Sequence, residues 1–236
     1  MLKETMSSDL LEGIRRAIPI DLGYLPVGFA FGVLAVKNGV SAHLAILMSL
    51  LMYSGSGQLV FASLWGAHTN ALSIIVAVGI INLRYLLQSA AEAPWMSDLS
   101  RFKRFLLGFG ITDETFAVHV TALQKGWQRN LLTMFVTNHL AQLGWVIGTV
   151  LGIFCGELIQ DVRPLGLDYA LTAMFLALLI LQLYTRLHIL VAIVTVVLSA
   201  WLKVIGVSQW NIALATIIGA TLGACLIMRR DKRSGK

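Results

Sequence analysis

The chain has 236 residues, of which 57% are hydrophobic and only 13% are charged, and its mean hydropathy is +0.79. This composition excludes an ordinary soluble globular protein and predicts an all-α protein that crosses a membrane several times. The formal net charge of +6 does not indicate nucleic-acid binding, because the basic residues stand at the ends of apolar runs, as they do in membrane proteins.

The first apolar run is interrupted by Pro19, Asp21 and Pro26, and no A-x-A cleavage site follows it. We therefore expect a membrane span rather than a cleaved signal peptide. Since no long hydrophilic stretch occurs, a single membrane domain is expected over residues 1–236. Segment 1–17 is expected to lie in the cytoplasm before the first span, and the basic segment 229–236 to form a cytoplasmic tail.

Apolar runs of about 20 residues predict the spans, because that length crosses a bilayer core as a helix. In chain order, the expected spans cover residues 18–36, 43–65, 70–91, 105–123, 131–155, 165–184, 188–202 and 212–228. Eight spans put both termini on one side, and the excess of Lys and Arg there predicts the cytoplasm.

One basic cluster argues against this topology, because Arg101, Lys103 and Arg104 would lie on the opposite side. A seven-span alternative makes 43–65 re-entrant, but it would place the basic tail outside. The eight-span topology is therefore preferred.

The second run contains a small polar patch that begins at Tyr53. Its members are Ser54, Gly55, Ser56, Gly57 and Gln58. Backbone N–H groups freed by a break in a membrane helix can bind an anionic substrate group, as they do in secondary transporters. The alternative is that the small residues only let two helices pack closely.

A second break is expected in the fourth run, where Gly108 and Gly110 precede Thr112 and Asp113. Thr112 or Asp113 could cap a half-helix there, and acidic groups suit the positive end of its dipole. Two facing broken helices make a better binding site than one.

Three charged residues lie at membrane depth, where a charge costs about 2.5–3.5 kcal/mol and is usually paired or functional. Arg84 lies about 12 Å and Asp113 about 13–14 Å from the same membrane face, at the helical rise of about 1.5 Å per residue, and Glu114 follows Asp113 directly. Arg84 is therefore expected to reach Asp113 or Glu114. The pair could be purely structural or part of a coupling mechanism.

Other intramembrane polar residues allow the same two interpretations. Asn82, His119 and His139 are candidates for ion coupling or proton relay, but buried hydrogen-bonded side chains are the more common arrangement.

The sequence also contains a faint internal repeat. Segment 28–34, G-F-A-F-G-V-L, resembles segment 144–150, G-W-V-I-G-T-V. Internal repeats are common in secondary transporters, although two apolar helices can also match by chance.

No nucleotide-binding loop, dinucleotide fingerprint, H-E-x-x-H or CxxC motif occurs, so we expect no ATP hydrolysis, cofactor or metal site. An intramembrane serine protease that uses Ser56 is a remote alternative, because position 54 is Ser where that family's G-x-S-G motif has Gly. The protein is expected not to be an enzyme.

Four motifs carry a family resemblance. They are F-G-V-L-A at 31–35, S-G-S-G-Q at 54–58, N-L-R-Y at 82–85 and T-D-E-T-F-A at 112–117. The chain resembles the AzlC/YgaZ family of bacterial inner-membrane branched-chain amino acid permeases. The sequence departs from that family at Tyr85, where histidine is common, and in the residues around Gln58.

The resemblance implies export of valine, leucine, isoleucine or methionine across the bacterial inner membrane. It also implies a small, separately encoded membrane partner of the AzlD/YgaH type. Together with the polar residues, it predicts a secondary transporter in which Gly55–Gln58 bind the substrate carboxylate and Asp113 or Glu114 bind its ammonium group. The proton gradient is the expected driving force. The alternative from another class is a non-transporting membrane scaffold or regulatory subunit.

Overall fold

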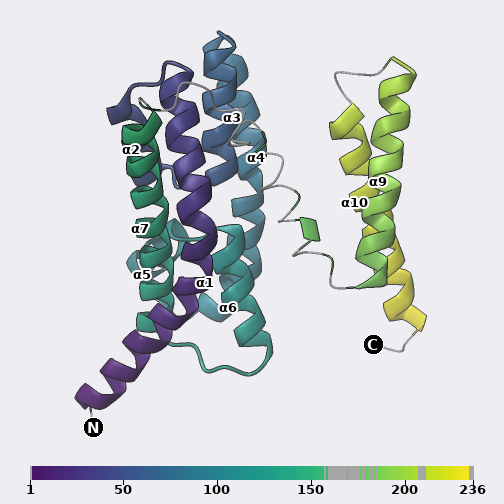
Figure 1. Cartoon of the computed structure of the whole chain (residues 1–236). Coiled ribbons are helices and arrows are strands. Elements are labelled where there is room, and N and C mark those ends of the chain that lie inside the picture. Colours follow the sequence, from purple (N-terminus) through teal and green to yellow (C-terminus); the bar gives the residue numbers. More distant parts are fainter. Residues whose placement is uncertain are drawn as a thin grey trace. The chain divides into compact units, whose positions relative to one another are not determined.

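The computed structural model describes residues 2–156, 185–206 and 211–233, together with positions 158, 169, 176, 179, 180 and 183. The span expected over 165–184 thus lies outside the described residues, apart from isolated positions. The chain divides into two compact units, Met1–Phe175 and Leu176–Lys236. Figure 1 shows that the described elements are helices, as predicted.

Four helices in the described part are long and apolar enough to cross a membrane. They cover Met6–Lys37, Ala71–Met96, Leu131–Gly156 and Arg186–Val204, which confirms the first, third, fifth and seventh predicted spans. Many of their large apolar side chains are exposed, as expected of helices that face lipid.

Helix α1 (Leu2–Lys37) and helix α7 (Leu131–Gly156) form the centre of the first unit and run in the same direction. Near their starts, Thr133 Oγ1 donates to the Asp9 carbonyl at 3.0 Å and Thr137 Oγ1 to the Gly13 carbonyl at 3.2 Å. Because α1 begins at Leu2, residues 2–17 of the expected N-terminal segment belong to this helix.

Glycines explain the close approach of α1 and α7. A Cβ added at Gly28 would lie 2.7 Å from the Trp145 carbonyl oxygen, and one added at Gly148 would lie 2.5 Å from that of Leu25. Gly28 and Gly148 belong to the two segments of the predicted repeat. Their similarity therefore reflects two helix faces that pack on each other with small residues.

The run expected to be the second span is two helices, α2 (Ala42–Leu51) and α3 (Gly55–Gly66). A Cβ at Gly66, the end of α3, would lie 2.8 Å from Asn38 Cβ, in the turn that precedes α2. The outer ends of both helices therefore lie at the end of α1, and the chain reverses at 52–54. This run is a re-entrant hairpin and not a full crossing.

The fourth expected span is likewise two helices, α5 (Arg101–Phe109) and α6 (Asp113–Gln124). Arg129, which follows α6, pairs with Asp98, which precedes α5, with a 2.6 Å contact between Arg129 Nη1 and Asp98 Oδ1. Hydrogen bonding to Arg129 lowers the pKa of Asp98 to about 2. The pair is therefore intact at neutral pH and is lost only as the pH falls through that value. Its position shows that the outer ends of α5 and α6 lie close together.

Helix α4 (Ala71–Glu92) and the short helix η1 (Ala93–Met96) join the two hairpins. Since α4 starts where α3 ends and leads to Asp98, it runs opposite to α1. Helices α1 and α4 are thus each followed by a hairpin that enters from the side the helix has just reached: α1 by α2–α3, and α4 by α5–α6. This is an inverted repeat of the kind found in secondary transporters.

The two hairpins correct the expected distribution of basic residues. The outer ends of α5 and α6 lie on the side where α1 begins, and the residues there include Arg101, Lys103, Arg104, Lys125 and Arg129. The cluster that conflicted with the eight-span topology therefore lies on the same side as the N-terminus. Within residues 2–156, Lys37 is the one Lys or Arg on the other side.

Cysteine labelling tests this topology. In a background without Cys155 and Cys225, Lys37→Cys and Ala67→Cys should react with a membrane-impermeant maleimide from one side. Ser97→Cys and Lys125→Cys should react only from the other side. A full second crossing would instead place Lys37→Cys and Ala67→Cys on opposite sides, and that labelling pattern would overturn the hairpin.

The second unit contains α9 (Arg186–Val204) and α10 (Asn211–Arg233), which pack on each other. A Cβ at Gly219 would lie 3.2 Å from Thr195 Cβ, and one at Gly223 would lie 3.4 Å from Val191 Cγ2. Small residues on α10 therefore allow this contact too.

Candidate functional site

Two half-helices begin near the middle of the first unit. Ser54 caps α3, with its Oγ accepting from the Gly57 N–H at 3.3 Å, and Thr112 caps α6 in a capping box with Thr115. The expected cap at Thr112 or Asp113 is therefore Thr112. Because the first amides of a helix lack partners within it, both N-termini carry partial positive charge.

Arg84 of α4 joins the two N-termini. Its Nη2 donates to Ser56 Oγ in the first turn of α3 at 2.5 Å, and its Nη1 lies 2.7 Å from Asp113 Oδ2 in the first turn of α6. Arg84 lies about 20 Å from the start of α4 at the helical rise of about 1.5 Å per residue, near the middle of the membrane-length helix. The predicted ion pair is confirmed, with Asp113 rather than Glu114 as the partner.

This ion pair is largely shielded from solvent, with relative side-chain exposures of 24% for Arg84 and 8% for Asp113. Gln88 Nε2 donates to the second carboxylate oxygen, Asp113 Oδ1, at 2.7 Å. Both oxygens of Asp113 thus have a side-chain donor on α4.

Asn82 and Tyr85 extend the network around the reversal in the first hairpin. Ser54 Oγ donates to Asn82 Oδ1 at 2.6 Å, and Arg84 Nη2 donates to Tyr85 OH at 3.1 Å. At the reversal itself, Tyr53 has φ of 43°, which an aromatic residue rarely adopts and which indicates a constrained turn. The structure therefore brings Ser54, Ser56, Asn82, Arg84 and Asp113 together.

Gln58 points away from this group. Its side chain is fully buried and Nε2 donates to Ser49 Oγ of α2 at 2.9 Å. Ser49 Oγ is also 2.9 Å from Thr149 Oγ1 of α7. Gln58 thus holds the first hairpin together, while the amides of Gly55 and Ser56 lie in the largely buried first turn of α3.

Glu114 has a partner that the sequence did not indicate. Tyr24 OH of α1 lies 2.5 Å from Glu114 Oε2 and 2.7 Å from Thr112 Oγ1. Tyr24 also packs edge-on against Trp145 and Tyr53, with ring centroids 5.5 and 6.3 Å apart. The apolar run around Tyr24 gave no sign of a polar contact, because its partners are 88 and 90 residues away.

The two histidines lie outside the Arg84 network. His119 Nε2 is 2.8 Å from Asn138 Oδ1, and Asn138 Nδ2 donates to the Leu107 carbonyl, which ties α6, α7 and α5 together. His139 is hydrogen-bonded through Nδ1 to the Phe135 carbonyl of its own helix at 2.9 Å. Among the described contacts of Ser56, the side-chain partner is Arg84 and not a histidine, so the geometry gives no support to a serine protease.

One face of α4 carries further buried polar atoms. Arg84, Gln88 and Glu92 are spaced four residues apart, which places them in a row along the helix. Arg84 Nε, Gln88 Oε1 and Glu92 Oε1 are buried and have no hydrogen-bond partner among the described residues. Unpaired buried polar atoms are rare, so this row indicates a place where water or a polar ligand belongs. In the described part of the chain, no three His, Cys, Asp or Glu side chains are grouped to hold a metal ion.

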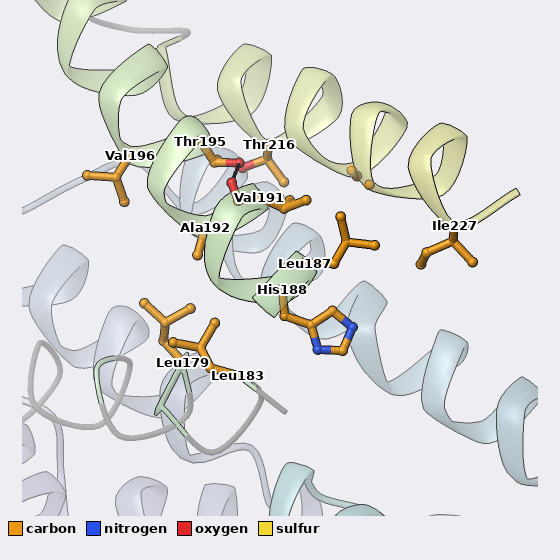
Figure 2. A pocket seen from close by; sticks show the side chains of 12 residues that line it. Leu179, Leu183, Leu187, His188, Val191, Ala192, Thr195, Val196, Thr216 and Ile227 are labelled. Carbon is orange, nitrogen blue, oxygen red and sulfur yellow. Dashed lines mark hydrogen bonds between the residues drawn. The ribbon is translucent and has the colours of Figure 1, made fainter. Parts of the chain in front are cut away.

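A separate cavity of about 670 Å³ lies in the second unit, along α9 and α10 (Figure 2). Figure 2 shows mainly aliphatic side chains around it, with His188, Thr195 and Thr216 as polar members. Thr195 already donates to the Val191 carbonyl at 2.8 Å. This lining suits an apolar occupant better than a charged one.

The arrangement in the first unit is one that membrane transporters use. Opposed half-helices supply N–H groups, and an ion pair between them can be exchanged for a charged ligand. The profile described as AzlC protein matches residues 19–159, which is more than half of the chain and includes both hairpins. The chain belongs to the AzlC family.

Relatives cover most of the chain. The inner membrane protein YgaZ of Escherichia coli (strain K12) is 27% identical over 227 residues, which are 93% of this chain and 89% of that protein. The branched-chain amino acid transport protein AzlC of Bacillus subtilis (strain 168) is 30% identical over 170 residues, 70% of this chain and 64% of that protein. An uncharacterized membrane protein of Archaeoglobus fulgidus is 32% identical over 214 residues, 89% of this chain and 92% of that protein. No solved structure matches the chain. Membership of the AzlC family links this chain to branched-chain amino acid transport.

Proposed function

We propose that this protein is a secondary transporter that exports branched-chain and similar apolar amino acids across the bacterial inner membrane. The observation that carries the proposal is Arg84, which holds the N-termini of two opposed half-helices together in the middle of the first unit. The Bacillus subtilis relative, which is named as a branched-chain amino acid transport protein, supports the substrate class.

An amino acid zwitterion suits the charges of this site. Its carboxylate would replace Asp113 on Arg84 and accept from the amides at the start of α3. Its ammonium group would then bind the released Asp113 carboxylate. Since Arg84 and Asp113 already neutralise each other, a zwitterion can enter without leaving a net charge in the membrane.

The substrate side chain would lie among apolar residues beside the hairpin reversals. Met52 Cε comes within 2.8 Å of a Cβ added at Gly57, so Met52 reaches the start of α3. Phe31 is fully buried and stacks on Trp145 with ring centroids 6.3 Å apart. These side chains favour a branched aliphatic group over a polar one.

The distribution of basic residues supports an orientation. Arg101, Lys103, Arg104 and Lys125 lie on the side where α1 begins, so the positive-inside rule supports a cytoplasmic location for that side and for the N-terminus. The first hairpin would then open toward the outside and the second toward the cytoplasm. We also propose that a small membrane protein of the AzlD/YgaH type works together with this chain.

Efflux of valine and methionine tests the proposal. Preloaded cells or vesicles that contain this chain should release both amino acids faster than cells or vesicles that lack this chain. The comparison is made both with and without the small partner. Asp113→Asn should abolish this release at normal protein abundance, because the variant cannot pair with an ammonium group or with Arg84. Asp98→Asn, the same change at an exposed ion pair, is the matched control and should keep wild-type efflux.

The same assay separates a transporter from a scaffold. A scaffold predicts that Asp113→Asn lowers abundance of the protein and of its partner together. Wild-type efflux from a well-folded Asp113→Asn variant would refute the role given to this acid.

A further inference from the structure

Two neighbouring acids at the start of α6 have different partners. Asp113 is held by Arg84 and Gln88, both at 2.7 Å, whereas Glu114 contacts the hydroxyl of Tyr24 at 2.5 Å. The charge of Asp113 is balanced by Arg84. Ionised Glu114 would therefore be an additional negative charge at membrane depth.

We propose that Glu114 is the proton-binding acid of the transport cycle and that Tyr24 lets it change protonation state without any movement of the surrounding side chains. This inference rests on the proposed transport function, but the protonation of Glu114 can be measured separately. Asp113 keeps the separate role of pairing with Arg84 or with the substrate.

The hydrogen bonds around Tyr24 carry the argument, because one hydroxyl has one proton but two oxygen neighbours. Tyr24 OH lies within hydrogen-bond distance of both Glu114 Oε2 and Thr112 Oγ1. Thr112 Oγ1 is in turn 3.2 Å from Thr115 Oγ1, and Thr115 Oγ1 donates to the Gly110 carbonyl at 3.0 Å. The four side chains form a chain of hydrogen bonds that ends on a backbone acceptor.

These linked hydrogen bonds accommodate both the ionised and the protonated state of Glu114. When Glu114 is ionised, Tyr24 donates to its carboxylate and Thr112 donates to Tyr24. When a proton binds to Glu114 Oε2, the carboxyl donates to Tyr24, Tyr24 donates to Thr112, and Thr112 donates to Thr115. In each state every hydroxyl has an acceptor, and the two states differ by the one proton that Glu114 takes from water or returns to it.

The surroundings of Glu114 favour reversible protonation. Tyr24 faces it from α1, Tyr53 from the hairpin reversal, Arg84 from α4 and Asp113 from its own helix. Of these groups, Arg84 is the one cation, and it already forms an ion pair with Asp113. Binding of a substrate carboxylate to Arg84 would alter that balance of charge beside Glu114, which links substrate binding to the proton.

Infrared spectroscopy tests the protonation itself, whatever the substrate is. The full-length protein in lipid should show a carboxylic acid C=O band that disappears as the pH is raised. This band should be lost in Glu114→Gln and kept in Asp113→Asn. Glu12→Gln, at a partly exposed glutamate of α1, is the matched control and should leave the band unchanged. Bands from other buried acids such as Glu92 cancel when the Glu114→Gln spectrum is subtracted from the wild-type spectrum. A difference spectrum without a pH-dependent carboxylic acid band would overturn the proposal.

Transport measurements test the coupling. In vesicles, Glu114→Gln should no longer move protons together with valine. It should also lose the net valine flux that a pH gradient drives, whereas the exchange of valine across the membrane should be less affected. Asp113→Asn should lose exchange as well. Valine-linked proton movement that persists in Glu114→Gln would refute the proposal. If wild-type vesicles neither exchange nor export valine, the proposed transport function fails, and the infrared result still decides whether Glu114 binds the proton.

Discussion

Replacing Arg84 with methionine is expected to abolish valine efflux and to lower the amount of folded protein. The substitution removes the contacts to Ser56 and to Asp113 at once, so the N-termini of α3 and α6 lose their common partner. It also leaves the Asp113 carboxylate buried and without its cation. Breaking a buried ion pair in this way typically costs about 3–5 kcal/mol. The measurements are efflux per molecule of protein and the thermal stability of the purified protein in detergent.

A double variant separates the two effects. Arg84→Met combined with Asp113→Asn removes both charges, so stability should recover in part while efflux stays absent. Arg129→Met is the matched control, because it breaks another arginine–aspartate pair in which the side chain of Asp98 is 65% exposed. It should have little effect on either measurement. Efflux that returns together with stability in the double variant would show that the Arg84–Asp113 pair is only structural.

The sequence predicted the centre of the site because charged residues in apolar runs are conspicuous. Arg84 and Asp113 had few possible partners at membrane depth, and their pairing followed from their similar distance to one membrane face. The two breaks were also predictable, since Ser54–Gly57 and Gly110–Thr112 interrupt otherwise apolar helices. The roles of all these residues in transport remain predictions.

The preferred topology was wrong about the path of the chain on either side of the two breaks, because it treated each broken run as one full crossing. A run of 23 residues such as 43–65 is long enough for one crossing or for two half-crossings, and its composition is the same in both cases. What distinguishes them is tertiary contact, namely Gly66 against Asn38 in the first hairpin and Arg129 against Asp98 in the second. Besides the two breaks, the conflict that Arg101–Arg104 create in the eight-span topology is the signal in the sequence that favours hairpins.

Tyr24 and Glu92 were missed for a related reason. Tyr24 stands in an apolar span, where an aromatic residue normally indicates packing, and its polar partners are supplied by a half-helix far along the chain. Glu92 lies just beyond the expected span 70–91, yet its exposure is 3% and it continues the row formed by Arg84 and Gln88. The four-residue spacing of these three residues was visible in the sequence and would have indicated a polar face on α4.

A second large effect is expected from Gly32→Val in α1. A Cβ at this position would lie 2.8 Å from Ile153 N and 3.0 Å from Gly152 C, so it would meet the backbone of α7 rather than a side chain that can move. Atoms added to a tight interface typically lower the stability of a protein by about 1–3 kcal/mol. Because the added Cβ meets backbone atoms, we expect a loss of stability at the upper end of this range or above it. Since α1 and α7 support both hairpins, we expect loss of folded protein and, with it, of transport.

Gly23→Val is the matched control, because it makes the same substitution in the same helix at a position where no other atom lies within 4 Å of the added Cβ. The two variants change intrinsic helix propensity alike, so the difference between their thermal stabilities in detergent isolates the packing against α7. Gly32→Val should aggregate at a clearly lower temperature than Gly23→Val. Equal stabilities would mean that α1 and α7 do not touch at Gly32 in the membrane, and the parallel glycine contact that supports the hairpins would have to be abandoned.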